Sequence, residues 1–359
     1  MTIYIVDIEP VETRYTGEWR QHVPELLRNN TAHDVVEVRG TDDIPAATTP
    51  GAFLNFGGTN IYKATQIEIV GKLFCDGKVN PGDHFVFTDA WHPGIINLKY
   101  MSELLNIKVT IHALWHAGSY DPADFLGRLI GDAKWVRYAE KSFYEAVDHN
   151  YFATDFHIDM FILNLFAEED YELFKDSALL NRKIIRSGWP MEYMVDHLSA
   201  FQGFTKKNQI VFPHRISVEK QPDIFKDLAK EMPEYEWIIC QEENLTKAEY
   251  HAVLANSKIV FSASTQETLG IGCYEGAIVG CWPLVPDRLS YTEMYIDEFK
   301  YPSEWTTDWD AYLKHKEQLI QRIHYIMSFY DEDADVFDGL VTHLVDNFFS
   351  AGNIIKQLK

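Results

Sequence analysis

The segment formed by residues 258–295, KIVFSASTQETLGIGCYEGAIVGCWPLVPDRLSYTEMY, constrains the fold of this chain more than any other. It opens with a short apolar, β-branched run at residues 259–261, which predicts a buried strand. A turn of small residues follows, then a helical segment from residue 273 that ends at Gly280, and a second buried strand at residues 282–285. This order of strand, turn, helix and strand is typical of an α/β protein.

Two glutamates, Glu267 and Glu275, lie eight residues apart within this segment, which is just over two turns of a helix. One carboxylate can therefore lie at the mouth of a site and the other deeper. Gly270 and Gly272 allow the backbone to open a helix with its free N–H groups pointing outward, which suits a phosphate. Two glutamates at this spacing usually lie on a solvated helix face, but the flanking strands favour a binding site here.

The net charge restricts the classes of partner. The chain has 359 residues and a formal net charge of -22, from 32 Lys and Arg against 54 Asp and Glu. This balance disfavours sequence-independent binding to nucleic acid or to anionic membranes, because both require a basic face. The length predicts about two domains, each able to bury its own core.

The cysteines and the apolar runs indicate a cytoplasmic protein. The four cysteines, Cys75, Cys240, Cys273 and Cys281, are scattered without a CxxC pair, so we expect free thiols rather than a zinc site or disulfides. The N-terminus runs directly into a strand with no basic leader, which predicts no signal peptide. No apolar run approaches the roughly 20 residues that a membrane-spanning helix requires.

Strand and helix signals alternate along almost the whole chain, which predicts parallel sheets flanked by helices. The alternation pauses at residues 182–208 and then restarts, so we place a boundary near Thr205. The predicted domains are residues 1–204 and 205–335, and a final amphipathic helix at residues 336–359 returns to the first domain. The predicted strands are residues 3–8, 34–39, 53–56, 84–89, 108–114, 151–155, 183–186, 210–212, 236–240, 259–261 and 282–285.

A second motif, VFPHRISVEKQP, lies just after the strand that opens the second domain. It places Arg215 and Lys220 five residues apart, and two fixed cations stabilise the charge of a diphosphate leaving group without a metal. Together with the glutamate segment, it resembles the motifs of retaining nucleotide-sugar glycosyltransferases related to glycogen synthase and sucrose synthase. That family reads approximately G-R-L-S-x-E-K-G here, and the match includes Ser217 and Glu219. His214 stands where the family has the first glycine.

The resemblance implies the GT-B fold, in which two Rossmann-like, doubly wound domains face each other across a cleft. It implies that Arg215 and Lys220 bind the donor diphosphate and that Glu275 binds the ribose hydroxyls. Glu267 would hold the transferred sugar and stabilise positive charge at the anomeric carbon. The backbone N–H groups that would cradle the diphosphate belong to Thr268, Leu269, Gly270 and Ile271. Glu293 matches a further family glutamate, or is surface charge.

The resemblance extends more weakly to residues 85–120 in the first domain. There Asp89 and His92 match a D-W-H stretch, and residues 110–112 match a strand ending T-I-H-N. The family's histidine faces the cleft and touches the donor sugar. His112 and His116 are both candidates for this role. The family's glycine-rich loop after the first strand is replaced by DIEPVETRYTGEWR, with a single Gly17, so Thr16 or Arg20 would contribute instead.

The function that follows from the resemblance is a retaining, metal-independent transfer of a sugar from a nucleotide sugar to a hydroxyl-bearing acceptor. We expect no permanently bound cofactor. The acceptor is a glycan, a lipid-linked group or a small molecule, and the charge makes a modified DNA base of a phage the less favoured choice. Two alternatives stay open: a nucleotide-sugar epimerase of the same fold, and a non-catalytic protein that binds sugar nucleotides or acts as a scaffold.

Overall fold

The computed structural model describes residues 1–12, 14–45, 54–166, 169–332, 334–337 and 339–359. The chain forms two compact units, each described by itself below. Unit 1 contains Met1–Ala153, His157–Pro190 and Ala351–Lys359, and unit 2 contains Thr154–Phe156 and Met191–Ser350. Apart from residues 154–156, the chain passes from unit 1 to unit 2 after residue 190 and returns after residue 350, whereas the sequence had suggested boundaries at 204 and 335.

Unit 1 is built on a six-stranded parallel sheet in the order β2-β1-β3-β4-β5-β6. The first strand is a continuous apolar run whose residues from Ile3 to Val6 are buried, as expected of a strand covered on both faces. β2 lies at the edge, where its first four residues alternate between exposed and partly buried and its last residue, Val38, is buried. The strands are β1 (Thr2–Val6), β2 (Asp34–Val38), β3 (His84–Phe87), β4 (Thr110–Leu114), β5 (His149–Phe152) and β6 (Ile184–Arg186).

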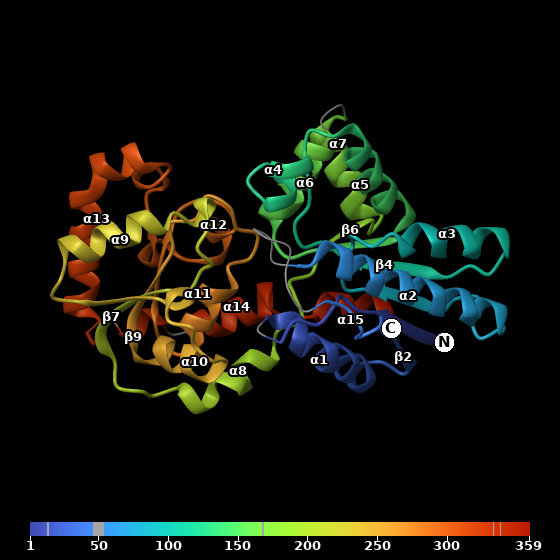
Figure 1. Cartoon of the computed structure of the whole chain (residues 1–359), viewed down its shortest axis with the longest axis horizontal. Helices are drawn as coiled ribbons and strands as arrows, with labels where there is room; N and C mark the ends of the chain where they lie inside the picture. Colours follow the sequence, from blue (N-terminus) through green and yellow to red (C-terminus); the bar gives the residue numbers. More distant parts are fainter. Residues whose placement is uncertain (13, 46–53, 167–168, 333, 338) are drawn as a thin grey trace. The chain divides into compact units, whose positions relative to one another are not determined.

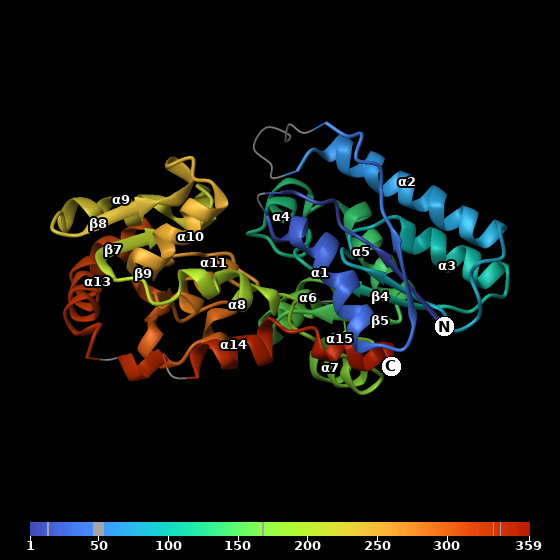
Figure 2. The same cartoon turned by 90° about the horizontal axis from the view of Figure 1, so that it is seen from below.

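Helices connect these strands and flank both faces of the sheet (Figures 1 and 2). Their starts follow ordinary capping chemistry: the Asn55 side chain accepts a hydrogen bond from the Gly58 N–H, and Asp124 caps α4 in the same way. The helices are α1 (Tyr15–Asn30), α2 (Phe56–Cys75), α3 (Gly94–Leu104), α4 (Phe125–Ile130), α5 (Lys134–Ala146), α6 (Asp155–Leu165), α7 (Tyr171–Leu180) and α15 (Gly352–Leu358).

Unit 2 is built on a five-stranded parallel sheet in the order β11-β10-β9-β7-β8. Every residue of β9 and β10 is buried, so these two strands form the centre of the core. The strands are β7 (Lys207–Phe212), β8 (Glu236–Ile239), β9 (Ser257–Phe261), β10 (Trp282–Pro286) and β11 (Lys300–Tyr301).

The helices of unit 2 also flank both faces of its sheet (Figure 1). A capping box between Thr246 and Glu249 begins α10. The helices are α8 (Tyr193–Leu198), α9 (Pro222–Glu231), α10 (Lys247–Asn256), α11 (Ile271–Ile278), α12 (Tyr291–Met294), α13 (Trp309–Phe329) and α14 (Leu340–Phe348).

Three local expectations differ from the structure. Of the strand predicted at residues 53–56, residue 53 lies outside the described residues, and Phe56 begins helix α2. The two-residue strand β11 was not predicted. The final segment forms two helices rather than one: α14 in unit 2 and α15 in unit 1.

Helix α11 packs closely on strand β9 through Gly276. A β-carbon at this position would lie 2.7 Å from Cγ1 of Val260. We therefore expect Gly276→Ala to lower the free energy of unfolding by about 1–3 kcal/mol, the usual cost of overpacking a core. The matched control is Gly71→Ala in α2, where a β-carbon meets nothing within 4 Å. That change should raise stability by about 0.5–1 kcal/mol. Denaturant unfolding followed by circular dichroism measures both, and equal stability of Gly276→Ala and the parent would contradict this packing.

Candidate functional site

The predicted donor residues lie in unit 2, in the loops that follow the neighbouring strands β7 and β9. Ligands of parallel α/β sheets bind beyond the carboxyl ends of the strands. Two contacts join the loops: the Thr265 N–H donates to the Glu219 carbonyl at 2.8 Å, and the Gln221 side chain donates to the Ala263 carbonyl at 2.6 Å. Residues 42 and 46 positions apart in the sequence are therefore joined directly.

Lys220 and Glu267 form a buried ion pair between these loops. The distance from Nζ to Oε2 is 3.1 Å, and the two side chains are 7% and 18% exposed. Lys220 also donates to the carbonyl of Gln266. Burial alone would raise the pKa of Glu267, but Lys220 and the neighbouring His214 outweigh it and lower this pKa to about 2. Glu267 is thus an anion throughout the neutral range.

Arg215 lies in the same loop, where the carboxylate of Glu219 holds its side chain. Its guanidinium donates to Glu219 at 2.6 Å and to Ser217 at 3.2 Å. Burial acts to raise the pKa of Glu219, but the hydrogen bonds from Ser217 and Arg215 lower it to about 2. The sequence had matched Ser217 and Glu219 to the family motif without giving them a role. The structure shows that they hold the Arg215 side chain, which stays 35% exposed.

Helix α11 begins beside this loop, at Gly270. Gly270 has φ +74°, and a β-carbon there would lie 2.6 Å from the ring of Tyr291, so both conformation and space require glycine. The predicted cradle residues Thr268 and Leu269 have buried side chains, and the Leu269 N–H donates to Oε1 of Glu267 at 3.4 Å. The first N–H groups of a helix have no acceptor within the helix, so Ile271 and its neighbours offer donors to an anion.

Glu275 lies one turn further along α11 and faces helix α10. Its carboxylate accepts a hydrogen bond from the Tyr250 hydroxyl at 2.7 Å, and His251 Nε2 lies 3.8 Å away. Burial and the Glu275 charge together raise the pKa of Tyr250, which keeps its hydroxyl protonated as a donor. Sequence analysis did not identify Tyr250 or His251, because their contact with Glu275 joins two helices and has no signature in spacing.

Glu293 has a structural role in unit 2. Its carboxylate accepts hydrogen bonds from the backbone N–H groups of Asp155 and Phe156, at 3.1 and 2.8 Å. Asp155 and Phe156 belong to unit 2 together with Glu293, so these bonds join distant parts of the sequence within that unit.

The two candidate histidines of unit 1 have different environments. His112 lies inside β4 and is fully buried, and its ring nitrogens pair with His84 at 2.9 Å and with the Tyr151 hydroxyl at 2.8 Å. Burial lowers its pKa well below the usual value, so the ring is neutral. The carboxyl end of β4 is at Leu114, and His116 follows it. The structure thus places His112 in the core of the sheet.

His116 lies at the edge where ligands of parallel sheets bind, and it is partly exposed. Its Nδ1 pairs with the Tyr15 hydroxyl at 2.9 Å and its Nε2 with the Thr88 carbonyl at 2.6 Å. Burial lowers the pKa of His116, although the nearby Asp89 charge acts in the opposite direction.

The other predicted residues of unit 1 make internal contacts. Asp89 accepts from Lys63 at 2.6 Å, and this charge outweighs burial to lower the Asp89 pKa to about 2. His92 is buried, pairs with the Gln66 side chain at 2.9 Å and accepts from the Gly94 N–H at 2.9 Å. Gly17 lies in the first turn of α1, where its N–H donates to the Arg14 carbonyl at 3.1 Å.

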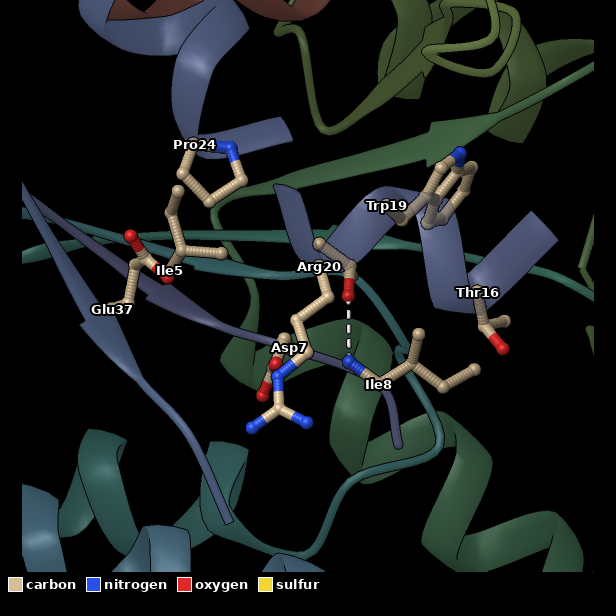
Figure 3. Close-up of a pocket in the computed structure, with 9 residues that line it drawn as sticks. Ile5, Asp7, Ile8, Thr16, Trp19, Arg20, Pro24 and Glu37 are labelled. Carbon is tan, nitrogen blue, oxygen red and sulfur yellow. Dashed lines mark hydrogen bonds between the residues drawn. The ribbon is translucent and has the colours of Figure 1, made fainter. Parts of the chain in front are cut away.

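A small pocket lies where β1 meets α1, in the region where the resembled family has its glycine-rich loop (Figure 3). Thr16 and Arg20 both line it, but each makes a contact within unit 1: Thr16 accepts from the Val11 N–H at 3.1 Å, and Arg20 pairs with Asp42 at 2.8 Å. The lining residues are Ile5, Asp7, Ile8, Thr16, Trp19, Arg20, Pro24, Glu37 and Thr88.

Among the described residues, no group of three or more His, Cys, Asp or Glu side chains is arranged to hold a metal ion. Within the same ranges, no helix is both long enough and apolar enough to cross a membrane.

Comparison with known proteins identifies the fold. No protein-family model matches the chain. The tRNA-queuosine alpha-mannosyltransferase of Drosophila melanogaster is 26% identical over 119 residues, which cover 26% of this chain and 32% of that relative. The chain thus matches about a third of the length of this curated relative.

Solved structures match over nearly the whole chain. Sucrose-phosphate synthase from Thermosynechococcus elongatus has a TM-score of 0.59 and 12% identity, covering 100% of this chain and 99% of that one. The catalytic domain of starch synthase IV from Arabidopsis thaliana, bound to ADP and acarbose, has a TM-score of 0.59 and 12% identity. The match covers 99% of this chain and 97% of that one. A glycosyltransferase from Rickettsia africae has a TM-score of 0.56 and 14% identity, and the match covers 99% of this chain and 96% of that one. The chain therefore has the two-domain α/β fold of GT-B glycosyltransferases, which confirms the predicted fold class.

The buried neutral His92 makes stability depend on pH. Burial, together with Lys63, lowers its pKa to about 3 in the folded protein, while an unfolded histidine titrates near about 6.5. The stabilisation is fully present above the unfolded value and is lost as the pH falls below it. Between pH 7 and pH 5 the free energy of unfolding should fall by about 2 kcal/mol through this residue.

His92→Asn should remove this part of the pH dependence, because asparagine does not titrate but can still accept from the Gly94 N–H. Urea unfolding of both proteins at pH 7 and pH 5 measures the difference. The same loss of stability in the variant as in the parent would show that His92 is not the titrating group.

Proposed function

We propose that this chain is a retaining, metal-independent glycosyltransferase that moves a sugar from a nucleotide-sugar donor to a hydroxyl-bearing acceptor. One observation carries the proposal. The carboxyl ends of β7 and β9 bring together two cations, Arg215 and Lys220, an anion, Glu267, and the first turn of α11. Cations and helix N–H groups stabilise a leaving diphosphate, and a carboxylate stabilises the positive charge that develops on the sugar.

The similarity to solved structures is consistent with this assignment, since the starch synthase is bound to ADP. The Drosophila relative is, by its name, a mannosyltransferase that acts on queuosine in tRNA. We therefore include queuosine-containing tRNA among the acceptors to be tested, beside glycans, lipid-linked groups and small molecules. Release of nucleoside diphosphate from nucleotide sugars measures the activity. The anomeric configuration of the product, read by NMR, should match that of the donor.

In unit 1 we assign the sugar-side histidine to His116 rather than His112. His116 is partly exposed beyond the end of β4, whereas His112 is fully buried with both ring nitrogens paired. Asp89 lies close enough to His116 to influence its charge, which supports a positioning role for Asp89.

Arg215 and Lys220 should bind the donor diphosphate. Replacing either by Ala should weaken the affinity for the nucleoside diphosphate by about 1.5–3 kcal/mol, the range for a hydrogen bond to a charged group. Lys226→Ala is the matched control, because Lys226 is an exposed lysine of the same unit that pairs with Glu242 on the surface. Calorimetry measures all three variants. Unchanged affinity in both Arg215→Ala and Lys220→Ala would refute the assignment.

Glu275 and Glu267 should act on different parts of the donor, the nucleotide and the transferred sugar. Glu275→Ala should lose affinity for the nucleoside diphosphate, because Glu275 is proposed to bind the ribose. Glu267→Ala should keep that affinity and lose turnover, as expected of an interaction that matters chiefly in the transition state.

Calorimetry and the release of nucleoside diphosphate from the donor distinguish these outcomes. Because a destabilised protein would lose both binding and turnover, the melting temperature of each variant is the control. Transfer by Glu267→Ala at the parent rate would exclude the proposed mechanism.

A further inference from the structure

His214 occupies a position in the donor loop to which the motif gives no role. It follows strand β7 with Pro213 between them, and its side chain is 8% exposed. Its ring packs edge-on against Phe212, with the ring centroids 5.1 Å apart. A β-carbon on Gly272 would lie 3.0 Å from Pro213, so the first turn of α11 packs directly against the residue before His214.

The neighbouring donors of this loop already have acceptors. Lys220 donates to Gln266 and Glu267, and Arg215 donates to Ser217 and Glu219. In contrast, Nε2 of His214 is buried and has no hydrogen-bond partner in the part of the chain that the structure describes. Buried polar atoms in proteins are nearly always paired, so an unpaired one within the candidate site is a place where a ligand can bind.

The charges around His214 indicate the chemistry of that ligand. Burial, Lys220 and Arg215 together lower the His214 pKa to about 3, and the Glu267 charge acts in the opposite direction. The ring is therefore neutral near pH 7 and carries one N–H. A donor beside two cations and the first turn of α11 suits an anionic oxygen, and a phosphate group meets these donors with several oxygens at once.

We propose that His214 is a ligand of the donor diphosphate and that its Nε2–H donates to a phosphate oxygen. The inference rests on the proposed function, since it assigns a further contact to the same donor site. It also accounts for the departure from the family motif, because an imidazole N–H supplies a donor at the position where that motif has glycine.

Binding of UDP, GDP and ADP to the full chain tests the proposal by calorimetry. His214→Leu removes the donor while keeping a buried side chain, and His214→Gln places an amide N–H near the position of Nε2. His214→Leu should weaken the binding of whichever diphosphate the parent binds by about 10- to 100-fold. His214→Gln should keep most of the affinity, and Lys226→Ala should keep all of it.

A second measurement uses the parent protein and does not depend on the folding of a variant. In ¹H–¹⁵N spectra of the histidine side chains, the His214 Nε2 signal should shift when the diphosphate is added and should not shift with the corresponding nucleoside. Equal diphosphate affinity in His214→Leu and the parent, or an unmoved Nε2 signal, would overturn the role of His214 while leaving the transferase proposal intact. A parent protein that binds none of the three diphosphates would overturn both.

Discussion

The proposed donor site depends on the ion pair between Lys220 and Glu267. Taking two charges out of water costs several kcal/mol per ion, and this cost is offset only when the pair and its additional hydrogen bonds are all in place. Lys220 satisfies the condition through the Gln266 carbonyl, and Glu267 lies 3.4 Å from the Leu269 N–H. The pair therefore fixes the loop after β9, and with it the backbone that opens helix α11 at Gly270.

The same pair sets the electrostatic state of the proposed site before a ligand binds. Each cation faces a carboxylate: Lys220 faces Glu267, and Arg215 faces Glu219. A diphosphate must therefore share these cations with carboxylates that are already ionised. Among the described residues, Nε2 of His214 has no hydrogen-bond partner, and the first N–H groups of a helix have no acceptor within it. In the proposed site, these donors would help to select a phosphate ligand.

The parts of the fold that the sequence predicted are those with a strong local pattern. β1, β9 and β10 are buried on both faces, so they appear as continuous apolar runs, and the predicted segments overlap them. The apolar run that ends at Phe56 was interpreted as a strand, because the cap that Asn55 provides to α2 is a single side-chain contact. β11 has two residues and exists through pairing with β10, which no local pattern records.

In the candidate site too, residues in local motifs were predicted and contacts that depend on packing were not. Arg215, Lys220, Glu267 and Glu275 were predicted from motifs, and the structure places the first three in two joined loops. The contact between Tyr250 and Glu275 spans 25 residues and depends on the packing of α10 against α11, so spacing could not predict it.

The histidines of unit 1 show why residue type alone does not identify a site. His112 matched the family motif, yet it belongs to a row of polar side chains that crosses the sheet from His84 to His149, where rings pair with one another and with Tyr151. Within this row His112 is fully buried with both ring nitrogens paired, and burial lowers its pKa, so its ring is neutral and offers no group to a ligand. His116, four residues later, lies beyond the end of β4 and keeps partial exposure. The position of the strand end, which sequence periodicity did not determine, therefore decides which histidine is available for chemistry.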